Sequence, residues 1–303
     1  MLTRTIILLF IILNLTIYAS NITPIPEEID YNLKKAQLGK KLFNDKRLSI
    51  NNTISCASCH NIKNGGDDNL VLPFGVNKAI GKVNAPTVLN SVFNFRQFWD
   101  GRAKNLEEQA IGPIENPIEM GHTFPDLIKK LNKTVYKEEF LRIYDDGITK
   151  RNIVNAIAEF EKTLITPNSR FDQFLKGDLK AITKYEKEGY ELFKDKGCIT
   201  CHHGVNVGGN LYNKFGIIFD ARSKNLGRYN LTKNEEDKYF FKVPTLRNIE
   251  YTAPYFHDGR YYELSQTVKE MALVQLGRPM KKDEIDKIVA FLKTLTGELM
   301  IIE

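Results

Sequence analysis

The chain has 303 residues, which is enough for two domains of ordinary size. Hydrophobic residues make up 42% of it and charged residues 26%, the composition of a soluble globular protein. The formal net charge of +6 is not gathered in any basic stretch, so nucleic acid is excluded as an expected partner.

The first twenty residues differ from the rest of the chain. Arg4 gives a short basic start, the run from Thr5 to Tyr18 is almost wholly apolar, and Ala19 and Ser20 are small. This pattern predicts a signal peptide over residues 1–20, with no stable membrane insertion after cleavage. The alternative is an uncleaved anchor, although the apolar run is shorter than the ~20 residues that a full bilayer span needs.

The four cysteines form two identical motifs, Cys56-Ala57-Ser58-Cys59-His60 and Cys198-Ile199-Thr200-Cys201-His202. A C-x-x-C pair alone is also compatible with a redox disulfide or a zinc site, but a His directly after the second Cys is the signature of haem c attachment. The two thiols bond the vinyl groups of the haem, and the adjacent His60 or His202 is the proximal iron ligand. The sequence therefore predicts two covalent haems c.

The two motifs lie in halves that repeat each other. Before each motif the sequence reads G-x-x-L-F-x-D-K, from Gly39 in the first half and from Gly189 in the second. After the motifs, P-T-x-x-N and F-[WH]-D-G-R recur at a constant offset of 158 residues, starting at Pro86 and Pro244. A period this long indicates duplicated domains rather than a solenoid.

Each half is expected to end in an amphipathic helix whose apolar stripe faces the core. The stripes are Ile153, Ile157, Phe160 and Leu164 in the first half, and Ile285, Ile288, Val289, Leu292 and Leu295 in the second. Thr166-Pro167-Asn168-Ser169 is the predicted linker. We therefore expect a mostly α fold of two tandem cytochrome c-like domains, each with one covalent haem, over residues 21–168 and 169–303.

Five segments together resemble the bacterial dihaem cytochrome c peroxidases. They are NAPTVLN (84–90), QFWDGRA (97–103), NPIEMG (116–121), VPTLRN (243–248) and YFHDG (255–259). The resemblance extends over roughly residues 30 to 297. It implies a periplasmic homodimer that reduces hydrogen peroxide to water with electrons from a small soluble redox protein, a monohaem cytochrome c or a cupredoxin.

The resemblance gives the two haems different roles. It implies that the C-terminal haem is the high-potential entry port for electrons, with Met271 as its second axial ligand, because Met opposite His raises the potential. It implies that hydrogen peroxide reacts at the N-terminal haem, where Glu119 moves protons and Gln109 lines the same pocket. The alternatives are a core Met and a solvated loop Glu.

The resemblance also implies roles for residues between the two haems. Trp99, the only Trp, helps electrons to cross, although a lone Trp also commonly fills a core. His257 lies near a haem propionate and is not expected to bind iron. Calcium is the remaining implied cofactor, held by the Asn84 side chain and by the backbone carbonyls of Thr252 and Pro254.

One position departs from the family pattern. Many members carry a distal His that caps the N-terminal haem until the other haem is reduced, and Val76 stands at that place here. Valine has no donor atom, so it cannot bind iron. We therefore expect an N-terminal haem that is open in the oxidised protein and needs no reductive activation. The alternative is that Met120 or His122 takes the place of the missing ligand.

Two other functions compete with a peroxidase. The first is a non-catalytic carrier with two saturated haems, which the presence of Glu119 and Gln109 disfavours. The second is a protein-modifying oxidase, like the related dihaem enzyme that matures a tryptophan-derived cofactor. That relative has Tyr at the axial position, so Met271 favours the peroxidase.

Overall fold

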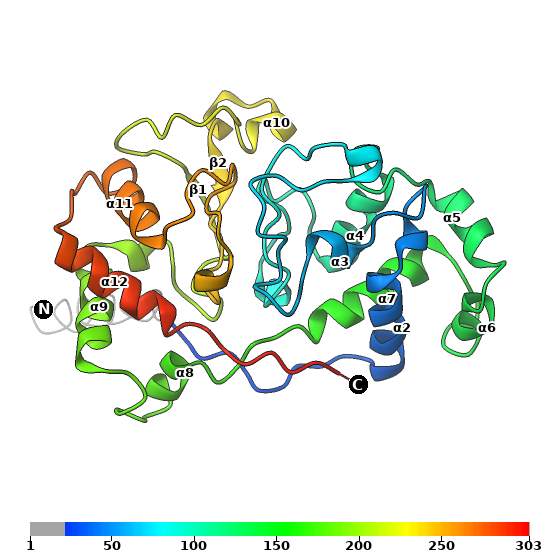
Figure 1. The fold of residues 1–303 in the computed structure, drawn as a ribbon, viewed down its shortest axis with the longest axis horizontal. Coiled ribbons are helices and arrows are strands. Elements are labelled where there is room, and N and C mark those ends of the chain that lie inside the picture. Colours follow the sequence, from blue (N-terminus) through cyan, green and yellow to red (C-terminus); the bar gives the residue numbers. More distant parts are fainter. Residues whose placement is uncertain (1–21, 303) are drawn as a thin grey trace, which may run out of the picture.

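The computed structural model describes residues 22–302, and the predicted signal peptide lies outside this range. Two mostly helical domains lie side by side along the long axis of the molecule (Figure 1). The expected fold class is confirmed. Between residues 22 and 302, no helix combines the length and the apolar character that crossing a bilayer requires.

The N-terminal domain is built from six helices and three short 3-10 turns within the described residues. The helices are α2 (Leu33–Asn44), α3 (Cys56–Cys59), α4 (Leu106–Glu115), α5 (Phe124–Leu131), α6 (Tyr136–Leu141) and α7 (Lys150–Lys162). The turns are η1 (Lys46–Leu48), η2 (Val76–Lys78) and η3 (Ser91–Phe93). The long stretches between helices leave room for loops that line a haem site.

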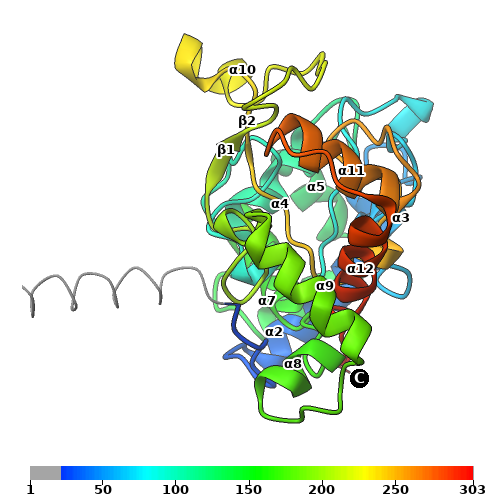
Figure 2. The ribbon, with the colours of Figure 1, turned by 90° about the vertical axis from the view of Figure 1, so that its left-hand side faces the viewer.

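The C-terminal domain repeats this plan and adds a small hairpin-like ladder. Its helices are α8 (Arg170–Leu175), α9 (Lys184–Asp195), α10 (Tyr229–Thr232), α11 (Leu264–Val274) and α12 (Lys282–Lys293), with turns η4 (Cys198–Thr200), η5 (Glu235–Asp237) and η6 (Ile249–Tyr251). Strands β1 (Tyr212–Lys214) and β2 (Phe240–Lys242) pair antiparallel, with Tyr212 opposite Lys242. Figure 2 shows α8, α9 and α12 of this domain facing the viewer.

In each domain one helix before the haem motif crosses the helix that ends the domain, α2 over α7 and α9 over α12. The predicted apolar stripe of α7 is buried, with Ile153, Ile157 and Phe160 0% exposed. In the stripe of α12, Ile285, Ile288, Leu292 and Leu295 are buried, whereas Val289 is only partly buried. A glycine lies at each crossing. A Cβ atom on Gly39 would lie 1.8 Å from the Ala156 carbonyl oxygen, and one on Gly189 would lie 1.9 Å from that of Lys287. The repeated glycine is thus explained by close backbone approach.

We expect Gly39→Ala to lower the free energy of unfolding of the holoprotein by about 3 kcal/mol, because a methyl group meets backbone that cannot move aside. Denaturant unfolding followed by circular dichroism measures this. Gly112→Ala, in α4, is the control. Its Cβ would meet only the Phe98 ring, at 3.1 Å, so a smaller loss is expected. An equal loss in both variants would contradict the explanation.

The predicted offset of 158 residues is visible in the backbone. Asn90 and Asn248 both adopt left-handed conformations, with φ of 59° and 58°, and Phe98 and Phe256 do so at 69° and 70°. The isolated bridge between Gln97 and Ala103 recurs as the bridge between Tyr255 and Tyr261. The two domains are therefore copies of one loop architecture, and the register inferred from the sequence is confirmed.

The two domains are joined by three extended segments that run along one edge of the molecule (Figure 1). The predicted linker lies in the segment between α7 and α8, where the Thr166 hydroxyl accepts hydrogen bonds from the Asn90 and Asn248 side-chain amides at 2.7 and 2.9 Å. The chain ends cross over. Ile22 packs in the core of the C-terminal domain, and Ile302 packs against that of the N-terminal domain. The boundary at residues 168 and 169 stays a prediction.

Candidate functional site

The first C-x-x-C-H motif places its cysteines at the two ends of α3, with His60 as the C-cap. His60 Nδ1 lies 3.2 Å from the Gly66 carbonyl oxygen, and burial lowers the pKa of the ring. The ring is therefore neutral and donates through Nδ1, which leaves the lone pair of Nε2 free for a metal.

The second motif repeats this arrangement. Cys198 begins η4, and His202 Nδ1 lies 3.3 Å from the Val207 carbonyl oxygen. Burial lowers the pKa of His202 to about 4, so this ring is also neutral. Both histidines are oriented by a carbonyl a few residues downstream, as metal-binding histidines commonly are.

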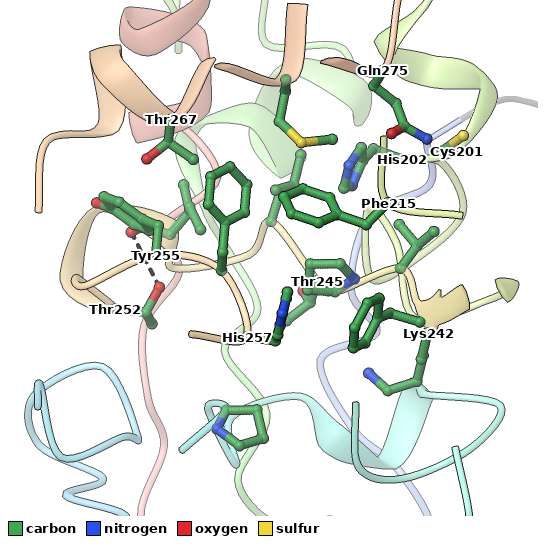
Figure 3. A pocket seen from close by; sticks show the side chains of 18 of the residues that line it. Cys201, His202, Phe215, Lys242, Thr245, Thr252, Tyr255, His257, Thr267 and Gln275 are labelled. Carbon is green, nitrogen blue, oxygen red and sulfur yellow. Dashed lines mark hydrogen bonds between the residues drawn. The ribbon is translucent and has the colours of Figure 1, made fainter. Parts of the chain in front are cut away.

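A cavity of about 230 Å³ opens beside the second motif. Cys198, Cys201 and His202 line it together with Met271, and Figure 3 shows aromatic rings such as Phe215 on its walls. Two thiols, an imidazole and a thioether in an apolar cavity are the donors that a haem c requires. The residues fit this cofactor, and the structure brings Met271 to the site where the sequence expects it.

Gln275, the C-cap residue of α11, holds the end of the helix that carries Met271. Gln275 Nε2 donates to the Lys214 carbonyl at 2.9 Å, and its Oε1 accepts from the Gly216 amide at 3.0 Å. This ties α11 to the loop that follows β1, which closes the same cavity. No pattern in the sequence predicts this role of Gln275.

Glu119 lies beside the first motif and not in open solvent. Burial raises the pKa of Glu119, although the Asn116 hydrogen bond and the Arg102 charge oppose the shift. Burial, the Asp68 charge and the Glu119 charge, in that order, raise the pKa of Cys59 to about 12. The Glu119 carboxylate and this thiol are therefore neighbours. Asn116 Nδ2 donates to Glu119 Oε1 at 2.6 Å.

Asn116 also ties Glu119 to the end of α4, the helix that carries Gln109. Asn116 is the C-cap residue of α4, and its backbone amide donates to the Gly112 carbonyl at 2.9 Å. Gln109 lies half-buried on the same helix. The role of Asn116 was not predicted from the sequence, although its place three residues before Glu119 in an Asx-type turn was a usable signal.

Val76 is buried, at 3% exposure, and its loop is fastened to the Glu119 segment. Its amide donates to the Glu119 carbonyl at 2.8 Å. A Cβ on Gly75 would lie 2.0 Å from the Ile118 carbonyl oxygen, so the two loops are in close contact. The Val76 side chain therefore offers no iron ligand.

Met120 and His122, the two alternatives to the missing distal His, are both buried. Met120 is 2% exposed and packs in the core formed by α2, α4, α5 and α7. His122 is 6% exposed, and its Nδ1 lies 3.1 Å from the Thr123 carbonyl oxygen. Burial and the Lys130 charge lower the pKa of His122.

Trp99 and His257 meet at the seam between the domains, with ring centroids 6.1 Å apart. Trp99 Nε1 donates to the Asn84 carbonyl at 2.9 Å. His257 Nε2 lies 2.8 Å from the Ser223 hydroxyl, and burial lowers the pKa of His257 to about 4. The Nε2 atom of His257 is therefore engaged by the Ser223 hydroxyl.

The three residues expected to bind calcium, Asn84, Thr252 and Pro254, line the same cavity. Asn84 Nδ2 donates to the Leu70 carbonyl at 2.8 Å, which leaves its Oδ1 available. Asp67, which no sequence pattern singled out, also lines this cavity, and its Oδ2 is buried without a hydrogen-bond partner among the described residues. Burial raises the pKa of Asp67 to about 7. An oxygen-only set with one orphaned carboxylate fits calcium.

Comparisons with known proteins identify both domains. The family described as di-haem cytochrome c peroxidase matches residues 33–180, and the cytochrome c family matches residues 186–296. A cytochrome c551 peroxidase of Nitrosomonas europaea is 51% identical over 282 residues, covering 91% of this chain and 84% of that protein. Cytochrome c peroxidase Ccp of Escherichia coli is 47% identical over 297 residues, covering 92% of this chain and 64% of that protein.

Among solved structures, that of a MauG-like protein associated with microbial copper homeostasis is similar, with a TM-score of 0.80 at 26% identity. The likeness covers 92% of this chain and 94% of that one. Two haem-attachment motifs, two cytochrome c domains and these relatives agree. The chain therefore belongs to the di-haem cytochrome c peroxidase family and is an enzyme of that class.

Proposed function

We propose that this enzyme works in the periplasm as a homodimer and reduces hydrogen peroxide without reductive activation. The observation that carries the proposal is the pairing of Glu119 with Val76 beside the first haem motif. The carboxylate is held by Asn116 at 2.6 Å, and the loop that holds the distal ligand in many relatives here offers only a valine.

When bound, the haems supply the iron redox chemistry, and the chain supplies proton transfer and geometry. The net reaction consumes two electrons and two protons for each hydrogen peroxide and gives two waters. Glu119 accepts a proton from one peroxide oxygen and donates it to the oxygen that leaves, which is general acid–base catalysis. Gln109 lines the pocket and orients the substrate. Trp99, packed on His257 at the seam, lies between the domains along the expected electron route.

The competing functions predict other site chemistry. A carrier with two saturated haems has no use for a carboxylate held in a buried position with a raised pKa. A protein-modifying oxidase with Tyr at the axial position differs from this chain, which has Met271 in the cavity with His202.

Turnover of hydrogen peroxide by the oxidised holoprotein, with a reduced monohaem cytochrome c as donor, tests the proposal. We expect full activity from the first turnovers, with no lag. A lag that pre-reduction removes would overturn the claim that no activation is needed. An absence of turnover even after pre-reduction would overturn the peroxidase site itself.

We infer that the donor docks on an apolar patch formed by Ile217, Ile218, Phe219 and Leu273, which are 50%, 53%, 52% and 42% exposed. The loop that bears three of them is fixed to the end of α11, since the Ile218 and Phe219 amides donate to the Val274 carbonyl at 3.0 and 3.2 Å. That helix carries Met271. Exposed Lys214, Arg222, Lys224 and Lys269 flank the patch in sequence. A small redox protein with an apolar contact surface and an acidic rim complements it.

Ile217→Glu is expected to raise KM for the protein donor about tenfold, because it places a charge in the apolar patch and repels an acidic rim. KM for hydrogen peroxide should not change. Steady-state kinetics with each substrate varied in turn measures both. Val135→Glu, at the start of α6 and 67% exposed, is the control on the other domain. The same rise in both variants would contradict docking at the patch.

We also propose that calcium binds Asn84, Thr252 and Pro254, with Asp67 as a further oxygen ligand or as a partner of bound water. Removal of calcium by a chelator is expected to lower Tm and activity, and added Ca²⁺ but not Mg²⁺ should restore both, because Mg²⁺ demands a tighter octahedral site. Asp67→Asn should weaken Ca²⁺ binding measured by calorimetry. A holoprotein without bound calcium by elemental analysis would contradict the site.

A further inference from the structure

Lys242 is a buried cation in the haem cavity of the C-terminal domain. It is 7% exposed and lines the cavity with Cys198, Cys201 and His202. Its backbone is fixed on two sides. It pairs with Tyr212 in the β1–β2 ladder, and its amide donates to the Trp99 carbonyl at 2.7 Å. The side chain therefore enters the cavity from a rigid position.

The ammonium group has no counter-charge in the protein. Across residues 22–302 it makes no hydrogen bond and no ion pair, and burial lowers the pKa of Lys242 to about 8 with no acidic group opposing the shift. Asp67 is the acid that lines the same cavity, but burial and Asp68 account for the raised pKa of that carboxyl, with no contribution from Lys242. An unpaired buried charge is strongly unfavourable, so a partner from outside the polypeptide is expected.

The shape of a haem c supplies such a partner. Its two propionate carboxylates lie on the edge of the ring opposite the two vinyl-derived bonds to cysteine. Figure 3 shows Cys201 near the top of the view and Lys242 near the bottom, beside the ribbon of the N-terminal domain. Lys242 would then hold a propionate of a haem bonded to Cys198 and Cys201.

We propose that the Lys242 ammonium pairs with a propionate of the haem attached at Cys198 and Cys201, and that this pair raises the reduction potential of that haem. The cation stabilises the reduced state, which carries one positive charge fewer than the oxidised state. Lys242 is therefore a positioning residue for the electron entry port. The proposal rests on haem attachment at the second motif and not on peroxide turnover.

The internal repeat gives this lysine a counterpart. Lys242 lies 158 residues after Asn84, as His257 lies 158 after Trp99. The seam shows the matching pair of hydrogen bonds, from the Lys242 amide to Trp99 at 2.7 Å and from the Asn84 amide to His257 at 2.9 Å. The position that carries an expected calcium ligand in one domain thus carries an ammonium group in the other.

Spectroelectrochemical titration of the holoprotein tests the effect on potential. In Lys242→Met we expect the reduced-to-oxidised ratio of the high-potential haem, at a fixed applied potential, to fall about tenfold, which is ~59 mV for one electron. Lys293→Met, which removes an exposed lysine of α12 in the same domain, is the matched control and should leave the ratio unchanged. An unchanged ratio in Lys242→Met, or an equal fall in both variants, would overturn the proposal.

A crystal structure of the holoprotein gives the second readout. We expect Lys242 Nζ at hydrogen-bond distance, about 2.9 Å, from a propionate oxygen of the C-terminal haem. A separation above about 4 Å, or pairing with the N-terminal haem, would overturn the assignment. Should Lys242→Met fail to load haem, Lys242→Arg keeps the charge and should retain both the haem and a potential close to that of the parent. Peroxidase activity enters neither readout.

Discussion

Glu119→Gln should lower kcat for hydrogen peroxide by a factor of about 10²–10⁴, the usual contribution of a positioned acid–base group. The amide has nearly the same shape as the carboxylate, and its oxygen can still accept the hydrogen bond from Asn116. It cannot take up a proton from one peroxide oxygen and return it to the other. The loss should therefore fall on kcat with the donor saturating, while both haems remain attached. Stopped-flow mixing of peroxide with the enzyme measures it.

The control for this substitution lies four residues away. Glu115 ends α4 and forms an exposed ion pair with Lys150 at 3.3 Å. Exposed pairs of this kind contribute little to stability, so Glu115→Gln should leave kcat and both reduction potentials unchanged. Asn116→Ala should give an intermediate loss, since it frees the Glu119 side chain without removing it. Parental kcat in Glu119→Gln would show that the proton moves by another route.

Much of the fold could be predicted because the chain repeats itself. One offset of 158 residues, read from short motifs, placed Asn90 and Asn248 in equivalent left-handed turns. It also holds at the start of the helix after the seam, since α4 begins at Leu106 and α11 at Leu264. The two helices differ by one residue in length, so the offset is not fixed past the end of α4, where Glu119 lies. Met271 lies inside α11 and falls opposite Pro113 of α4.

Contacts between the domains could not be predicted, because periodicity within one domain does not say which face meets the other. Thr166 looked like part of a simple linker, yet its hydroxyl accepts hydrogen bonds from both repeated asparagines. The crossing of the chain ends also has no local signal. Ile22 and Ile302 pack on the domains farthest from them in sequence.

The same limit applies to charges at the site. Asp67 and Lys242 are ordinary polar residues in the sequence, and only the fold buries both of them in one cavity. Asn116 was closer to prediction, because its distance from Glu119 is local. The residues expected to act on peroxide were predicted from the resemblance to the di-haem cytochrome c peroxidases. The structure adds those that hold them in place.

Val76→His should make the oxidised enzyme dependent on pre-reduction. An imidazole at this place supplies the ring nitrogen that Val76 lacks, and the loop is already fastened to the Glu119 segment by the 2.8 Å hydrogen bond from residue 76. We expect the initial rate of the as-isolated variant to fall at least about tenfold, a population shift of about 1.4 kcal/mol. Pre-reduction should restore it. Low-temperature EPR of the parent protein should show a high-spin ferric signal that the variant loses.

Bulk must be separated from ligation in this experiment, because Val76 is buried against Gly121. Val76→Leu adds volume without a donor atom, so it should keep the high-spin signal and show no lag. His122→Ala removes the remaining nearby imidazole and should also leave the parent behaviour unchanged. A parent protein with purely low-spin haems would mean that another side chain caps the site. For Met120 to be that side chain, the core around it must open first, and the packing that α2, α4, α5 and α7 provide is lost.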